Sequence, residues 1–419
     1  MKKTVAVIIT FLAFYIANAQ QLELENCLAE VNKNYPLLQQ KNIEEEINLI
    51  SNKLNKTTWL PQISANGQAT YQSDVTTLNI PVQGFLVEPL SKDQYKLVLD
   101  VNQTLYDGEI SKLKSDLQNL SSQINNSKVD IEIRNVMQQT QKYFFNALLA
   151  QENITIWATT QNEIQLRIKI QESGVKYGSV KQSQVDILKV ELLKIDQKII
   201  EIKSAKKTAI EIIALFSGLM INENTILKTP NQYATSAIDF GKRTEFKNYE
   251  FQKESIDKNY QLTASNLLPK ASLFGQGGYG RPGLNQLSNE FKTYYIVGAK
   301  VKWEISSFFK NGKNKKISQY NKENIDVQKS VLEMNLKSQK TSFDNEISKL
   351  NELIEKDQNI IDLRIKISKV AASELDNGIT TATNYLIEKN AEKQALQSLI
   401  IHQIQKINNQ YDIKLLTGN

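Results

Sequence analysis

Glycine and proline are scarce in this sequence, which holds 16 and 7 of them among its 419 residues. An average protein carries about 12% of the two together, roughly twice this share. Helix interiors tolerate both residues poorly. The scarcity therefore argues against an all-β sandwich with many tight turns and favours long, uninterrupted helices.

Cysteine and histidine are rarer still, because Cys27 and His402 are the single residue of each type. One cysteine excludes an internal disulfide, and no spacing typical of a metal site appears. Catalysis usually needs clustered His, Cys, Asp or Glu side chains, and no P-loop pattern is present. The 51 basic and 45 acidic residues are mixed along the chain. We therefore expect no enzyme, no cofactor, no metal and no nucleic-acid partner.

Long hydrophobic runs are also lacking, apart from one at the N-terminus. Two lysines precede an apolar core, and Ala17-Asn18-Ala19 has the small-x-small pattern of a cleavage site. These features predict a secretory signal peptide at residues 1–19. The alternative, a membrane anchor, needs about 20 apolar residues.

The positions of the few glycines reveal an internal repeat. Two stretches of 65 residues contain neither Gly nor Pro, and each leads to a glycine turn and a further such stretch of 39 residues. Repeats of this kind are the first signal to seek in a sequence. We predict a tandem duplication with a first structural repeat at 20–219, a linker at 220–243 and a second repeat at 244–419.

The long stretches show helical periodicity. We expect entry helices at about 22–58 and 244–267, and long helices at 109–173, 179–217, 313–377 and 379–417. The stretch 313–377 carries two apolar stripes, one including Leu350 and the other Ile360, so this helix should pack on both sides. A helix of 65 residues spans about 100 Å. A fibrous coiled coil would also have such a length.

Between the helices the period changes to two, which predicts strands at about 61–72, 95–106, 270–279 and 294–305. Each run has the length of a tilted membrane strand, with one polar and one apolar face. Lys300, Lys302 and Glu304 would then face a water-filled lumen. Aromatic residues mark the strand ends like membrane-interface girdles: Trp59, Tyr71, Tyr95, Tyr106, Tyr279, Tyr295 and Trp303. An amphipathic sheet on a soluble core is the alternative.

Four strands are too few for a closed membrane barrel, whose smallest known forms use about eight. Lipid does not tolerate an open sheet edge. Two, three or four copies would supply 8, 12 or 16 strands, and the spacing does not choose among them.

In its ordered recurrence of motifs the chain resembles the TolC-like outer-membrane efflux protein family. The resemblance rests on strand entries at Leu60-Pro61 and Leu268-Pro269, on strand exits at Gly108 and Gly312, and on the turns at Gly178 and Gly378. It implies a mainly α protein with membrane β structure: a trimeric 12-stranded outer-membrane β-barrel, four strands per chain, continued by a long periplasmic α-helical barrel.

The same resemblance implies a passive exit duct for small molecules or proteins. Its partners would be two further copies, outer-membrane lipid, and an inner-membrane pump reached through a periplasmic adaptor. A periplasmic coiled-coil adaptor or scaffold is the alternative function, although it leaves the four strands unexplained.

The hairpin turns would form the periplasmic tip, where the resemblance places a constriction. The candidate tip residues are Gly174, Gly178, Gln184, Gly378, Thr380 and Asn384. At the position of Gln184 and Asn384 the family often has Asp, and at that of Thr380 an Arg used in gating contacts. The sequence therefore predicts a neutral amide ring and weak block by trivalent cations.

Overall fold

The computed structural model describes residues 21–77, 89–233 and 239–417. The expected signal peptide at 1–19 and the closing Gly418 lie outside these residues. The elements group into two units, which are described separately. One comprises residues 39–129 and 244–332, and the other residues 130–243 and 333–419 together with the N-terminal part. The long helices α3 and α6 contribute residues to both units.

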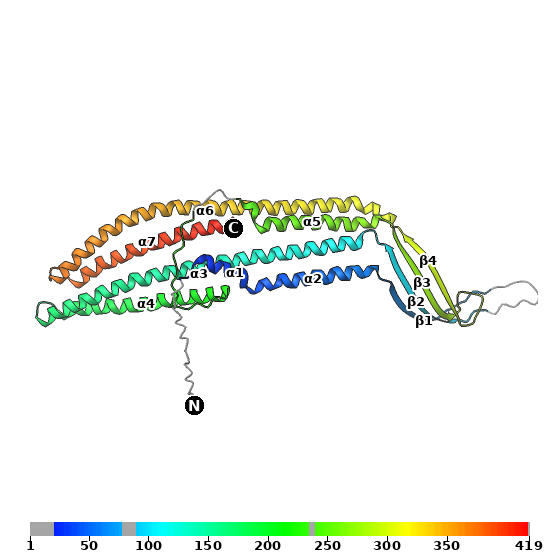
Figure 1. Ribbon diagram of the computed structural model, residues 1–419, viewed down its shortest axis with the longest axis horizontal. Coiled ribbons are helices and arrows are strands. Elements are labelled where there is room, and N and C mark those ends of the chain that lie inside the picture. Colours follow the sequence, from blue (N-terminus) through cyan, green and yellow to red (C-terminus); the bar gives the residue numbers. More distant parts are fainter. Residues whose placement is uncertain (1–20, 78–88, 234–238, 418–419) are drawn as a thin grey trace, which may run out of the picture. The chain divides into compact units, whose positions relative to one another are not determined.

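The order of elements repeats along the chain (Figure 1). The first repeat comprises α1 Leu24–Asn34, α2 Gln39–Lys56, β1 Gln62–Tyr71, β2 Asp93–Tyr106, α3 Ile110–Lys176 and α4 Gln182–Ser217. The second comprises α5 Thr244–Ala264, β3 Lys270–Arg281, β4 Lys292–Lys302, α6 Phe308–Asp376 and α7 Ala382–Leu416. Short 3-10 turns join several of them, including η2 Thr57–Trp59 and η5 Ile305–Ser307.

The first entry helix differs from the expected continuous helix at 22–58. It is broken into α1 and α2, because Pro36 lacks an N–H and Tyr35 before it is extended, with φ −62° and ψ 130°. α1 is anchored by the linker, where Leu22 forms a parallel bridge with Leu227. Gln151 of α3 exchanges two hydrogen bonds with the backbone of Leu227, of 3.0 and 2.9 Å.

All four strands form one antiparallel sheet in the order β1-β2-β3-β4. Directly paired residues share a face of a sheet, so the register assigns every strand residue to one of two faces. The first, called here the polar face, carries the row Ser64, Asp100, Gln276 and Ile296 and the pair Lys270–Lys302. The second, the apolar face, carries Ile63, Leu97, Leu99, Leu273 and Val297.

The helices of the sheet-containing unit follow the same lateral order as the strands. Asn52 of α2 bonds Asn119 of α3, and Lys258 of α5 pairs with Asp116 of α3 at 2.8 Å. Three ion pairs then join α5 to α6: Lys253–Asp326, Lys322–Asp257 and Lys329–Glu250. The helices α2 and α6 therefore form the two edges of this layer, as β1 and β4 do in the sheet.

The other unit packs the α3–α4 and α6–α7 hairpins together (Figure 1). Its main cluster buries Ile164 of α3, Leu188 of α4, Leu375 of α6 and Tyr385 of α7. These residues come from both repeats, so neither hairpin completes this core alone. A second cluster near the chain ends includes Phe144, Ile213 and Tyr411. Within the described residues, we find no helix with both the length and the apolar character that a membrane crossing requires.

A buried carboxylate between α3 and α7 yields a prediction on stability. Asp412 accepts hydrogen bonds from Gln141 Nε2 at 2.8 Å and Asn408 Nδ2 at 3.1 Å, while Gln141 Oε1 is buried without a hydrogen-bond partner in the described structure. Burial raises the pKa of Asp412 to about 6. The folded state therefore favours the protonated acid, and this stabilisation is lost as pH rises through that value.

We expect Asp412→Asn to raise the melting temperature at pH 7.5, because the amide needs no proton, and a turn of the Gln141 amide group would let its Oε1 accept from the new N–H group. The gain should be on the order of 2–3 kcal/mol at pH 7.5, since each pKa unit is worth about 1.4 kcal/mol. It should nearly vanish at pH 4. Thermal unfolding followed by circular dichroism measures both, and an equal gain at the two pH values would contradict the ionisation argument.

Candidate functional site

Lys300 and Lys302, which the sequence analysis expected to face water, lie on the polar face of the sheet. Lys300 pairs with Ser272, and Lys302 pairs directly with Lys270. Glu304 corrects the sequence analysis, because β4 ends at Lys302 and Glu304 lies beyond it, where it caps η5. Its carboxylate reaches back to Lys302 Nζ at 2.6 Å. The three residues are thus close together, although only the two lysines belong to the strand.

The middle of the polar face is organised around Asp100. Its two carboxylate oxygens accept hydrogen bonds from Asn66 at 2.9 Å and Gln276 at 2.7 Å, which links β1, β2 and β3. Amide side chains satisfy the carboxylate without neutralising its charge. Side chains in water make such contacts readily, whereas a lipid-facing carboxylate would be strongly unfavourable. This face is therefore suited to line an aqueous passage.

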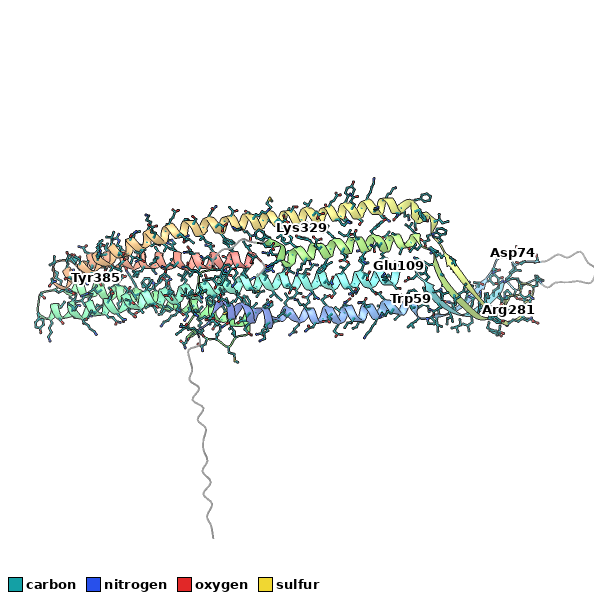
Figure 2. The ribbon with its side chains drawn as sticks, turned by 45° about the horizontal axis from the view of Figure 1, so that its top comes forward. Trp59, Asp74, Glu109, Arg281, Lys329 and Tyr385 are labelled. Carbon is teal, nitrogen blue, oxygen red and sulfur yellow. The ribbon has the colours of Figure 1, made fainter. Side chains whose placement is uncertain are left out.

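The aromatic candidates all lie on the apolar face or at its ends. Trp59 and Arg281 mark opposite ends of the sheet in Figure 2, with Trp59 toward the helices. Tyr106 and Trp303 also lie at the helical end, and Tyr71, Tyr95, Tyr279 and Tyr295 lie toward the loops. All seven are exposed. Their arrangement in two bands is typical of membrane-interface girdles.

Tyr106 reaches the apolar face only because the register shifts at the end of β2. Strict alternation from Val98 and Asp100 would place it on the polar face. A register shift between Thr104 and Tyr106 instead pairs it with Ala271. An irregularity of this kind redirects a side chain at the end of a sheet.

At the loop end, the structure reveals an aromatic cluster that the sequence analysis missed. The Phe291 ring stacks on Tyr95 and Tyr279, with centroids 6.1 and 5.5 Å apart. The guanidinium of Arg281 lies 5.2 Å from the Phe291 ring and pairs with Asp93. Ser91 and Asn289 join the same loops through two further hydrogen bonds. Spacing could not have suggested the contacts between Tyr95 and Phe291 or between Ser91 and Asn289, because these residues lie almost 200 positions apart.

The two predicted hairpin turns are closed by equivalent glycines. Gly178 has φ 74° and Gly378 has φ 71°, values that favour glycine. In the first turn, Gly174 O accepts from the N–H groups of Ser179 and Val180, at 2.9 and 3.3 Å. A Cβ on Gly174 would lie 2.5 Å from Val180, so a larger residue there must displace the turn.

The two tip amides occupy different environments, although the repeat makes them equivalent. Gln184 Oε1 accepts a 2.6 Å hydrogen bond from the N–H of Ala382, so it caps α7 of the other hairpin. Asn384 is exposed, and its side chain donates to Thr380 Oγ1 at 3.4 Å. Within one chain, Gln184 joins the hairpins together and Asn384 stays accessible. The amide ring therefore remains a prediction, with Asn384 as its better-placed member.

Charged contacts that the sequence did not reveal also join the two hairpins. Arg167 of α3 pairs with Asp376 of α6, and Gln171 donates to Leu375 O at 3.0 Å. Lys389 of α7 is buried between Glu163 and Glu392, at 2.5 and 2.9 Å. These carboxylates raise its pKa although burial alone lowers it. Next to this network is Tyr385, which is almost fully buried (Figure 2).

A groove of about 570 Å³ lies on α6 and α7 beside the second turn. Thr380 and Asn384 line it together with Lys366, Glu374, Glu388 and apolar residues. Glu388 is paired with Arg364 at 3.0 Å. Asp186, another acid near the turns, accepts a hydrogen bond from Gln182.

The family resemblance of the sequence implies a channel, and for such a channel the charge of these side chains leads to a prediction on block by cations. We expect trivalent cations such as hexamminecobalt to block conductance only weakly in planar bilayers, because Gln184 and Asn384 are neutral and Glu388 already has a cationic partner. Replacing Asn384 with Asp should strengthen the block by tenfold or more, since it would add one carboxylate per copy. Strong block of the unaltered protein, relieved by Glu388→Gln or Asp186→Asn, would show that the acidic ring lies elsewhere.

The sequence itself matches no family model and no curated protein. The fold, however, matches several solved structures over 94% of this chain. They include the outer-membrane channel OprN, with 12% identity, 89% of its chain covered and a TM-score of 0.70. CusC has 14% identity, 92% coverage and a TM-score of 0.69. The open state of the MtrE outer-membrane channel of Neisseria gonorrhoeae has 13% identity, 89% coverage and a TM-score of 0.66.

The chain therefore has the fold of TolC-like outer-membrane efflux channels. It is mainly helical, with four antiparallel strands and paired long helices. At 12–14% identity the likeness extends to the fold alone. It covers nearly the full length of this chain and of the OprN and CusC chains. This confirms the fold class that the sequence predicted for one chain.

Proposed function

We propose that this protein is a passive exit duct of the outer membrane, through which small molecules or proteins leave the cell. One observation carries the proposal: a four-stranded sheet has one polar face and one exposed apolar face, and long helices continue from it. The fold it shares with outer-membrane channels supports this reading. The duct would be located in the outer membrane and extend into the periplasm.

The edges of the sheet support assembly from several copies. β1 and β4 are its end strands, so each has a second edge that pairs with no other described strand. A membrane does not tolerate such edges. Head-to-tail pairing of β1 of one copy with β4 of the next would remove them. We propose three copies, which give the 12 strands expected from the family resemblance.

The edges of the helical layers support the same head-to-tail contact. α2 exposes an apolar stripe at helical spacing: Ile43, Ile47, Ile50 and Leu54. At the opposite edge, α6 exposes a second stripe: Ile317, Tyr320, Val327 and Val331. Apolar stripes of this regularity are rare on exposed helices and mark packing surfaces.

The unit formed by the α3–α4 and α6–α7 hairpins also exposes apolar stripes on its outer helices. α4 contacts α3, α3 contacts α7, and α7 contacts α6, through pairs such as Lys189–Glu172, Lys389–Glu163 and Arg364–Glu388. Beside the turns, α4 also meets α7 through Gln184 and Ala382, and α3 meets α6 through Arg167 and Asp376. Both α4 and α6 nevertheless keep exposed apolar side chains. α4 exposes Val190, Leu193 and Ile200, and α6 exposes Ile360, Leu363, Ile367 and Val370. The exposed α6 residues include Ile360 and Ile367 of the second stripe, which the sequence predicted to contact a neighbour.

A duct of this kind needs energy from elsewhere. We propose that an inner-membrane pump supplies it and that a periplasmic adaptor joins the pump to the tip formed by the α3–α4 and α6–α7 hairpins.

Fractionation of cell envelopes tests the proposal. We expect the protein in the outer-membrane fraction as a heat-modifiable oligomer, crosslinked to trimers, and co-purifying with an adaptor and a pump. Recovery as a soluble periplasmic monomer would refute the duct and favour the adaptor or scaffold.

A further inference from the structure

Three lysines gather on the polar face where the sheet adjoins the helices. Lys270 and Lys302 are direct cross-strand partners, and Lys300 lies one pair further along the same face. We call Lys270, Lys300 and Lys302 the lysine cluster. Like charges placed directly opposite each other destabilise a sheet. The cluster is thus unfavourable for folding and needs another explanation.

Nearby acidic groups offset only part of this charge. Glu304 pairs with Lys302 at 2.6 Å. The same carboxylate also interacts electrostatically with Lys270 and Lys310. Lys270 donates to the neutral amide of Asn266 at 3.0 Å, and Lys300 is exposed. Further up the face, Asp100 keeps its negative charge, because only neutral amides bond it. Within the cluster itself, three ammonium groups share the single carboxylate of Glu304.

The position of the cluster identifies its surroundings. The neighbouring residues Val297, Ala299 and Val301 point to the opposite, apolar face, and the two valines are about three-quarters exposed. That face is suited to lipid, so the lysines face water. An ionic partner must therefore come from solution inside the duct and not from lipid headgroups.

We propose that the lysine cluster attracts anionic solutes into the sheet-lined section and makes the duct anion-preferring. This inference rests on the proposed function, because three copies would bring the nine ammonium groups of the cluster around one lumen, against six carboxylates from Glu304 and Asp100. A passage lined by one sign of charge, with low-dielectric walls, focuses the field and raises the local concentration of counter-ions. The solutes favoured would be those carrying carboxylate, phosphate or sulfate groups.

Reversal potentials in planar bilayers test this inference. The full-length protein is inserted into phosphatidylcholine, which has no net charge, across a KCl gradient near 0.1 M, where the Debye length is about 10 Å. We expect Lys300→Gln/Lys302→Gln to lower the chloride-to-potassium permeability ratio by about twofold or more. The matched variant Lys300→Arg/Lys302→Arg keeps the charge and should keep the ratio. Glu304→Gln should raise it.

The outcomes separate the two proposals. If the unaltered protein forms no channel, the duct itself is refuted. If channels form and the glutamine pair leaves the reversal potential unchanged, the lysine cluster does not select ions and the inference falls while the duct stands. If the glutamine pair fails to assemble, Glu304→Gln decides alone, and a ratio that does not rise would overturn the inference.

Discussion

A lysine at Leu97 or Val297 is expected to abolish assembly of the protein in the outer membrane. Both residues lie in the middle of the apolar face, on β2 and β4, and both are more than half exposed. A lysine facing lipid near the bilayer midplane costs about 2–4 kcal/mol. Three copies would add that cost three times within one barrel. Urea-washed outer membranes should then contain no heat-modifiable oligomer.

Lysines on the other face provide the matched control. Ser64→Lys places the new charge opposite Asp100. Ile296 precedes Val297 in the chain but lies on the polar face, so Ile296→Lys places its charge there. Both should assemble normally, because their ammonium groups face water. A soluble amphipathic sheet would give a different result, since a lysine exposed to water on either face would then have little effect on assembly. Equal assembly of the Val297→Lys and Ile296→Lys variants would contradict the membrane location of the sheet.

The turns and strands were predictable because their signals are local. The left-handed backbone at Gly178 and Gly378 favours glycine, and the long helices between such turns form where glycine is absent. In the strands, a period of two separates Ile63 from Ser64 wherever one face meets water. Such patterns can be read without knowing which segments meet.

Strand ends were less predictable, because alternation does not report hydrogen bonding. The pattern of Val301, Trp303 and Ile305 continues past the end of β4, so the prediction extended the strand and included Glu304. The backbone instead turns into η5 directly after Glu304. The register shift before Tyr106 was equally hidden, since nothing in its local sequence marks it.

The candidate tip depends on contacts between the repeats, which the sequence did not supply. Gln184 and Asn384 occupy matching positions, yet only Gln184 meets the free N–H of Ala382, almost 200 residues away. Arg167 and Asp376 are likewise ordinary helix residues until the hairpins pack. A duplicated sequence predicts equivalent backbones, but each side chain responds to neighbours that are not duplicated.

Acidic substitutions on α2 should separate assembly of the copies from folding of each chain. Ile50 and Leu54 belong to the exposed stripe of α2, whereas Asn52 on the opposite side bonds α3. We expect Ile50→Glu/Leu54→Glu to give monomers with unchanged helix content. Each large apolar side chain gains about 1.5–3 kcal/mol when buried, and a carboxylate in its place would lose that gain and add a desolvation cost.

Light scattering in detergent and circular dichroism measure the two properties. Lys56→Glu is the control, because it changes an exposed residue of α2 away from the stripe. It should leave the trimer intact. If the stripe instead faced the lumen or bulk water, the double variant would remain trimeric, since an exposed apolar side chain contributes little to assembly. A trimer that tolerates both carboxylates would therefore require another surface to join the copies, and α2 and α6 would lose their proposed role as the two sides of one interface.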